Sequence, residues 1–161
     1  MSLRPLLEKK FDLKGDAVIT GSHTTAIATI NTWTPINVDN NSGNDKYFSS
    51  GGNTGHSGST AVVYYLDSHI KGRALVNYSI HVVTAKDFSI QVFRSDDSNH
   101  TTYEAIDSSI FKSKGPCTAV NSFFMDLLPG RRLKVEIQNN EDDVDLVIDH
   151  FNFVVDGYQV I

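Results

Sequence analysis

The chain has 161 residues, of which 40% are hydrophobic, so it is long enough to bury one core and to form a single domain. Its net charge of −5 excludes a protein that binds nucleic acid through a basic surface, because such binding depends on clustered Lys and Arg. Cys117 is the only cysteine, which excludes a disulfide within the chain.

No segment approaches the run of about 20 apolar residues that a membrane helix needs. The residues after Met1 also lack the apolar core of a signal peptide. We therefore expect a protein that is synthesised in the cytoplasm without a signal peptide and does not insert into a membrane.

The first part of the chain is predicted to start with a short connection and to continue in strands. Residues 1–13 are expected to form an N-terminal stub or a connection to a shaft. The segment Asn40–Ser59 contains five Gly and five Ser, which indicates a long surface loop. Strand candidates rich in β-branched and aromatic residues surround this loop at Asp16–Thr20, Thr24–Ile30, Thr34–Val38 and Thr60–Leu66.

The clearest strand signal is the period-two alternation of Arg73–Val83. Its apolar side chains fall on one face: Ala74, Val76, Tyr78, Ile80 and Val82. After the turn-like residues 85–87, Phe88–Phe93 alternates again, which predicts the hairpin partner of the preceding strand. The polar run Ser95–His100 then ends this second strand.

Four further strands are predicted in the last third of the chain. Ala119–Leu127 is rich in apolar residues, and Leu133–Ile137 and Val144–Ile148 alternate on either side of a polar turn. The last strand starts at Phe151 and continues to the end of the chain. Gly157 interrupts its pattern in the way that is typical of a β-bulge.

The strand count defines the fold class. About nine or ten short antiparallel strands, closely spaced turn signals and almost no helical periodicity predict an all-β protein, a jelly-roll β-sandwich. The segment Tyr103–Phe111 fits neither a strand nor a helix clearly. One jelly-roll domain is expected over residues 14–161.

The C-terminal two thirds of the chain resembles the jelly-roll tip or head domains of bacteriophage tail fibres and receptor-binding fibres, which are relatives in shape of the tumour-necrosis-factor-like trimers. The segment Thr24–Val38 fits the entry strands of such domains. The other segments that carry the resemblance are 74–82, 88–93, 127–139 and 144–155. The resemblance implies a homotrimer that presents its loops to a cell-surface ligand.

Large apolar residues next to each other provide a physical argument for the trimer. Phe123, Phe124 and Met125, or the pair Tyr64 and Tyr65, place bulky groups on both faces of one strand. One face fills the core, and the other needs cover. Either a second copy of the chain supplies that cover, or the strand is buried on both sides within one chain.

No motif for catalysis, a cofactor or a metal ion is found. The six histidines lack the close spacing of a zinc pair, and no two carboxylates stand out as a glycosidase pair. Cys117 follows a Gly-Pro turn without a recognisable base partner. The acidic group at 141–145 lacks the pattern of a calcium loop and predicts a solvated hairpin turn. We therefore expect neither an enzyme nor a bound cofactor or metal.

Sugar binding needs only exposed aromatic rings with hydrogen-bonding groups beside them, because the rings offer flat apolar faces to sugar C–H groups. A structural role is the alternative for each candidate, and Trp33 in particular fits a core or interface anchor. The loop and strand-end residues of these types are Trp33, Tyr47, His56, Asn99, His100 and Tyr103.

Three functions remain open. The leading hypothesis is a non-enzymatic, homotrimeric receptor-binding or adhesion domain at the tip of a virion or cell-surface fibre, which recognises a cell-surface glycan or similar ligand. A structural capsid or appendage protein is the second, although the chain lacks the basic arm of genome-packaging jelly rolls. A monomeric carbohydrate-binding module is the third.

Overall fold

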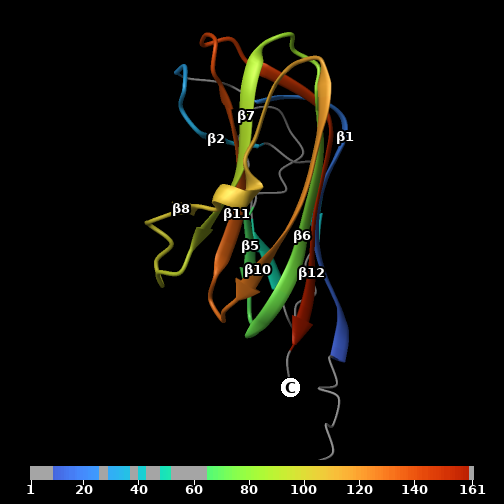
Figure 1. The fold of residues 1–161 in the computed structure, drawn as a ribbon, viewed down its shortest axis with the longest axis vertical. Coiled ribbons are helices and arrows are strands. Elements are labelled where there is room, and N and C mark those ends of the chain that lie inside the picture. Colours follow the sequence, from blue (N-terminus) through green and yellow to red (C-terminus); the bar gives the residue numbers. More distant parts are fainter. Residues whose placement is uncertain (1–8, 26–28, 37–39, 43–47, 52–64, 160–161) are drawn as a thin grey trace, which may run out of the picture.

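Two antiparallel β-sheets face each other in the computed structural model (Figure 1). The described residues are 9–25, 29–36, 40–42, 48–51 and 65–159, and side chains are described for 24–25, 29–36 and 66–156. The first sheet has the strand order β10-β6-β12-β1-β3. The second has the order β4-β5-β11-β7-β8, with β2 beside β11 and β9 beside β7.

The elements run as follows: β1 Lys9–Thr25, β2 Thr34–Pro35, β3 Asn40–Ser42, β4 Phe48–Gly51, β5 Tyr65–Ser68, β6 Gly72–Val82, β7 Asp87–Ser95, β8 Glu104–Ala105, the 3-10 turn η1 Asp107–Ser109, β9 Phe111–Lys114, β10 Cys117–Leu127, β11 Arg132–Asn139 and β12 Leu146–Gln159. This architecture confirms the predicted all-β jelly-roll sandwich. No helix within the described ranges is long and apolar enough to cross a membrane.

The connection from β6 to β7 and the connection from β11 to β12 are two of the places where the chain crosses from one sheet to the other. Strand β6 pairs with β10 and β12 in the first sheet, whereas β7 pairs with β11 in the second. The predicted hairpin of β6 and β7 is therefore wrong. The physical reason is that alternation determines which face of a strand is buried, but it does not determine the partner strand.

The core lies between the two sheets and is built from the predicted alternation. The inward residues of β6, from Ala74 to Val82, are at most 1% exposed. Strand β7 differs from the expectation, because the polar residues Ser89 and Gln91 on its other face are also buried. The segment between β8 and β9 covers part of this strand, and Gln91 donates to the carbonyl of Ile106.

The two crossovers are tied together at one end of the sandwich. Lys86, on the β6–β7 crossover, pairs with Glu141 (3.4 Å) and with Asp142 on the β11–β12 crossover. The hydrogen bond to Asp142 raises the pKa of Lys86. The acidic group is exposed at Glu141, Asp143 and Asp145, as predicted, but it lies on a crossover between the sheets and not in a hairpin turn. It joins two segments far apart in the chain.

A glycine permits a close backbone approach at the same end. A side chain at Gly115 would place its Cβ 2.1 Å from the carbonyl oxygen of Thr84. The N–H of Gly115 also donates to the carbonyl of Lys86, at 3.0 Å. Only glycine allows the β9–β10 connection to lie this close to the β6–β7 crossover.

Several predicted boundaries differ from the structure. Strand β1 starts at Lys9, inside the predicted stub, and ends at Thr25, whereas Ile30 lies in a turn that follows residues 26–28, which are not described. Strands β3 and β4 lie within the predicted loop 40–59. Tyr103–Phe111 contains β8 and η1, which are too short to give a periodic signal. Whether the N-terminal residues connect to a shaft stays a prediction.

The predicted bulge at Gly157 is displaced to a neighbouring strand. Pairing of β12 with β6 runs through Gly157 without a shift. The irregularity lies on β1 instead. Its register with β12 shifts between Lys10 and Lys14, and the β12 residue opposite this shift is Gly157. A second shift, between Ile148 and His150, marks an irregularity of β12 against β6.

The hydroxyl of Tyr78 links the core to η1. It donates to the carbonyl oxygen of Ser109 at 2.6 Å, and burial raises the pKa of Tyr78. We expect Tyr78→Phe to lower the free energy of unfolding by about 1 to 2 kcal/mol, because the buried carbonyl then loses its donor. Urea unfolding at a fixed protein concentration measures this, and an unchanged midpoint would contradict the stabilising role of the bond.

Candidate ligand-binding site

The loop between β7 and β8 is organised around the carboxylate of Asp97. The backbone N–H groups of Asn99, Thr101 and Thr102 donate to its oxygens at 2.8 to 3.1 Å. Ser95 donates from its hydroxyl at 3.1 Å. The bonds from Thr102 and Thr101 are the main cause that lowers the pKa of Asp97 to about 2.

The low pKa of Asp97 predicts how the loop responds to acid. Because the folded pKa lies below the ordinary value, the stabilisation is present at neutral pH and is lost as the pH falls from about 4 through 2. We expect the carbon-13 signal of this carboxyl group to titrate with a midpoint near 2. The Asp97→Asn variant assigns the signal, and a midpoint near 4 would contradict the hydrogen bonding described.

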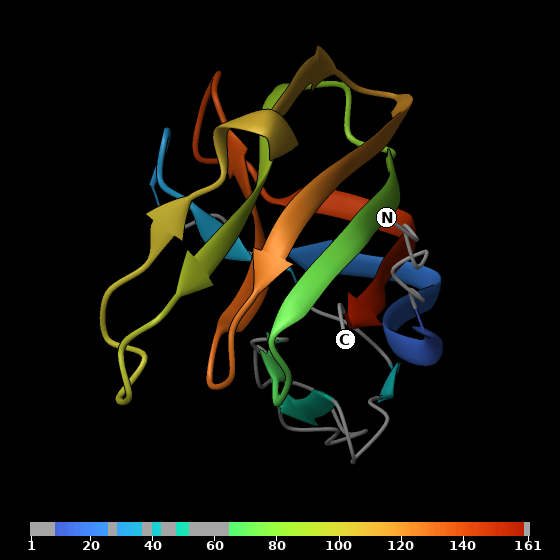
Figure 2. The same cartoon turned by 60° about the horizontal axis from the view of Figure 1, so that its bottom comes forward.

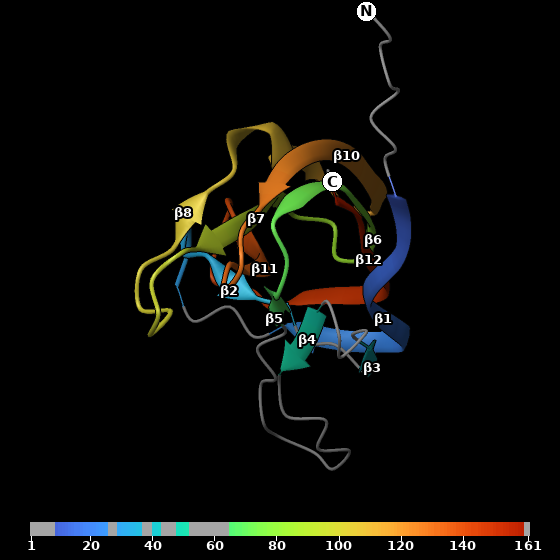
Figure 3. The ribbon, with the colours of Figure 1, turned by 90° about the horizontal axis from the view of Figure 1, so that it is seen from below.

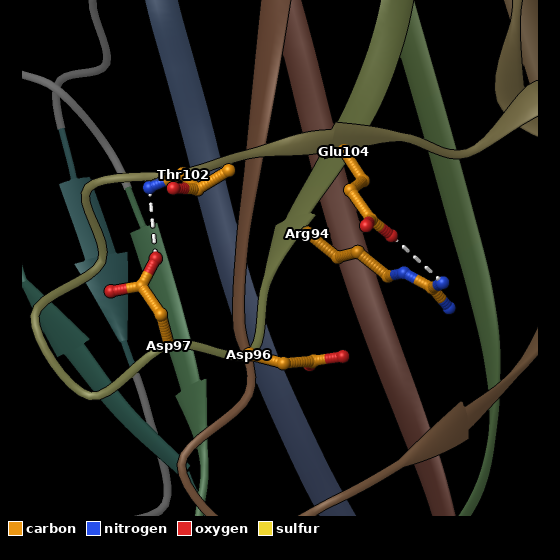
Figure 4. Close-up of a pocket in the computed structure, with 5 residues that line it drawn as sticks. All are labelled: Arg94, Asp96, Asp97, Thr102 and Glu104. Atoms are coloured by element: carbon orange, nitrogen blue, oxygen red, sulfur yellow. Dashed lines mark hydrogen bonds and ion pairs between the residues drawn. The ribbon is translucent and has the colours of Figure 1, made fainter.

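A small cavity of about 200 Å³ opens beside this loop. Its lining residues are Arg94, Asp96, Asp97, Thr102 and Glu104. Arg94 Nη2 donates to Glu104 Oε2 at 3.1 Å. Figure 4 shows that Arg94, Asp96 and Glu104 extend to the same side, whereas Asp97 turns back into its own loop toward the N–H of Thr102.

A buried arginine holds Asp96, at the start of the loop, in place. The side chain of Arg131 is 6% exposed and makes two bonds to the carboxylate of Asp96, at 2.6 and 2.8 Å. It also donates to the backbone carbonyl of Asp126, at the end of β10. The hydrogen bond from Arg131 lowers the pKa of Asp96. The cavity is thereby attached to the edge of the first sheet.

Aromatic rings gather on the outer face of the second sheet. Trp33 and Phe93 meet edge to face with their centroids 5.3 Å apart. Lys134 Nζ lies 3.7 Å from the centroid of Tyr103 and 2.5 Å from a carboxylate oxygen of Glu136. We call Trp33, Phe93, Tyr103 and Lys134 the aromatic shelf. Burial raises the pKa of Tyr103.

The shelf and the cavity lie on opposite faces of the β7–β8 ribbon. Phe93 pairs with Ala105 and Arg94 with Glu104, so neighbouring residues of each strand point in opposite directions. The loop that joins β7 to β8 projects from the side of the sandwich away from β1 and β12 (Figures 2 and 3).

Four of the predicted sugar-binding residues can be placed. Trp33 and Tyr103 come together on the shelf through Phe93 and Lys134. Asn99 and His100 lie in the Asp97 loop, where His100 has a φ of 51° and a buried Nδ1 with no partner among the described residues. Tyr47 and His56 lie outside the described residues.

The residues that complete both surfaces were not predicted from the sequence. Phe93 and Lys134 are read as ordinary strand residues, and their contact depends on the register of two strands about 40 positions apart. Asp96 and Asp97 belong to a polar run that was interpreted only as the end of a strand. An aspartate followed by Ser-Asn is typical of an Asx turn, which is the signal that was available.

The outer face of the first sheet exposes apolar side chains. Phe124 is 64% exposed and Val120 is 63% exposed, whereas Phe123 and Met125 point into the core. The neighbours of Phe124 and Val120 on this face include the half-buried Leu75, which lies opposite Phe124 on β6. For this strand, burial on both sides within one chain is therefore wrong.

Polar side-chain pairs flank this apolar surface. Arg73 lies 3.6 Å from Asp126 near Phe124, and His81 Nδ1 lies 2.5 Å from Asp149 at the other end of β6. Within the described ranges, no group of three or more His, Cys, Asp or Glu side chains could hold a metal ion.

Comparison with known proteins rests on structure alone, because no protein-family model and no curated protein matches the sequence. The Eiger TNF from S. frugiperda superposes with a TM-score of 0.54 and 15% identity, over 92% of this chain and 93% of that one. The chain has a tumour-necrosis-factor-like jelly-roll fold. Two other neighbours agree with this TNF-like fold.

The globular domain of zebrafish complement 1qA gives a TM-score of 0.52 and 8% identity, over 88% of this chain and 94% of that one. Murine APRIL at pH 8.5 gives a TM-score of 0.51 and 13% identity, over 89% of this chain and 98% of that one. At these identities the likeness shows the TNF-like fold and nothing of the ligand.

Proposed function

We propose that this chain is a non-enzymatic receptor-binding or adhesion domain, which works as a homotrimer at the tip of a virion or cell-surface fibre and binds a cell-surface glycan or similar ligand. The TNF-like fold and the resemblance to fibre-tip domains support this proposal. The observation that carries it is the exposed apolar surface around Phe124 and Val120.

This surface has the composition of a protein–protein contact. Phe124 and Val120 lie beside Leu75 and Ser79 of β6, and the uncharged polar pair of Ser122 and Asn77 lies between them. The ion pair of Arg73 with Asp126 lies at the margin of the surface. Exposed apolar side chains with uncharged neighbours and a charged rim are typical of interfaces.

The trimer leaves the ligand surfaces accessible. Contacts through the outer face of the first sheet do not cover the outer face of the second sheet, where the aromatic shelf lies. Trp33 is half-buried there and Tyr103 is held over Lys134, so their rings are pre-positioned. We propose the aromatic shelf as the place where the face of a sugar ring packs.

Binding to an array of cell-surface glycans tests this function. We expect the wild-type protein to bind at least one glycan class, and a monomeric variant to bind it about 10² to 10⁴ times more weakly, because three linked sites act together. Trp33→Ala should weaken binding in both forms.

Two outcomes would favour the other functions. Large particles that bind no glycan would point to a capsid or appendage protein, since the same apolar face would then serve assembly alone. Equal glycan binding by a wild-type monomer would point to a carbohydrate-binding module.

A further inference from the structure

The cavity on the other face of the β7–β8 ribbon is a separate surface from the aromatic shelf. We infer that it takes a single neutral sugar ring and disfavours acidic sugars such as sialic acid or sulfated sugars. This inference rests on the proposed glycan-binding function, and it names the class of ligand that the second surface accepts.

The charges of the cavity favour a ligand without negative charge. The lining includes Asp96 and Glu104, which extend toward the cavity, and Asp97, whose carboxylate turns back into its own loop, against the single guanidinium of Arg94. Arg131 compensates Asp96 from behind, at 2.6 Å. No cation is paired with Asp97 in the part of the chain that the structure describes, and its low pKa keeps it ionised. A carboxylate or sulfate group would therefore meet a net negative site.

Arg94, the one cation among the residues that line the cavity, already pairs with Glu104. Arg94 Nη2 donates to Glu104 Oε2 at 3.1 Å, so an acidic sugar would have to displace an internal partner to reach it. The hydrogen-bonding capacity that remains suits hydroxyl groups. Glu104 Oε1 has no partner among the described residues and accepts from an O–H, and the hydroxyl of Thr102 both donates and accepts.

The size of the cavity limits the ligand to one ring. Its volume of about 200 Å³ is smaller than the roughly 300 to 1,000 Å³ of sites for drug-sized ligands. The wall is also fixed before binding, because Asp97 holds the loop through several hydrogen bonds and Arg131 holds Asp96. A fixed wall costs less ordering when the ligand binds.

Nuclear magnetic resonance with four free sugars tests the inference on the full chain. The probes are galactose and N-acetylglucosamine, which are neutral, and N-acetylneuraminic acid and galactose 6-sulfate, which are acidic. We expect the neutral sugars to shift the backbone amide signals of Arg94, Thr102 and Glu104. The acidic sugars should bind at least 10 times more weakly.

A substitution that frees Arg94 gives a sharper result. We expect Glu104→Gln to weaken neutral-sugar binding and to raise the affinity for galactose 6-sulfate at least several-fold, because the guanidinium loses its internal carboxylate. Glu141→Gln, at the crossover end, makes the same change in net charge far from the cavity. It should leave the preference of the cavity unchanged.

Equal or tighter binding of the acidic sugars to the wild-type cavity would overturn the inference. So would sugar-induced shifts confined to the indole N–H of Trp33, although the proposed function would survive that result because the shelf would still bind glycan. Shifts at the cavity in a monomeric protein would instead support the inference and contradict the trimer.

Discussion

The Asn139→Ala variant is expected to unfold with a free energy about 3 kcal/mol below that of the wild-type protein. Asn139 is fully buried at the end of β11. Its amide nitrogen donates to Asp142 at 2.8 Å and to the carbonyl of Val144 at 2.9 Å, and its side-chain oxygen accepts from the N–H groups of Glu141 and Asp142. Alanine removes these bonds and leaves partly buried backbone groups without these partners.

The effect is large because this side chain shapes a crossover between the two sheets. Asp142, which Asn139 holds in place, also pairs with Lys86 of the other crossover. Chemical unfolding at one protein concentration measures the loss. Asn99→Ala, at an exposed turn position, is the matched control and should change the free energy by less than about 0.5 kcal/mol. Equal effects of the two substitutions would contradict the role given to Asn139.

The Phe124→Asp variant is expected to convert the proposed trimer into a folded monomer. A carboxylate in the apolar centre of each contact costs at least about 2 kcal/mol, as for the truncation of an interface hot spot. Three contacts per trimer then amount to about 6 kcal/mol, or roughly four orders of magnitude in the dissociation constant. The fold itself should tolerate the change, because Phe124 is 64% exposed in the single chain.

Val144→Asp provides the control for the Phe124 experiment. Val144 is 45% exposed and lies on the β11–β12 crossover, away from the outer face of the first sheet. This variant should keep the mass of the wild-type protein. A Phe124→Asp protein that stays trimeric would show that the copies meet through a different surface.

The sequence predicted the buried faces of strands well and their partners poorly. The apolar residues of β6 are buried as the alternation indicates, because a period of two is a property of one strand. The partner of β7 is β11, which follows it by about 40 residues, and nothing local to Ala85–Asp87 distinguishes a crossover from a hairpin turn. Strand pairing at long range depends on the packing of the whole sandwich.

The candidate site was predictable only in part, for a related reason. Aromatic residues near polar loops identified Trp33 and Tyr103 as members of one kind of site. Their common neighbours, Phe93 and Lys134, lie on two central strands, where a sequence pattern gives no reason to select them. The cavity was missed because Arg94 and Glu104 come together through the pairing of β7 with the two-residue strand β8, which leaves no periodic signal.

The mass of the wild-type protein in solution, measured by light scattering at micromolar concentration, tests whether the chain forms the proposed homotrimer. We expect about three times the chain mass of 17.8 kDa, unchanged over a range of concentrations. A mass near 17.8 kDa under the same conditions would contradict the trimer and leave the exposed face around Phe124 and Val120 without its proposed partner.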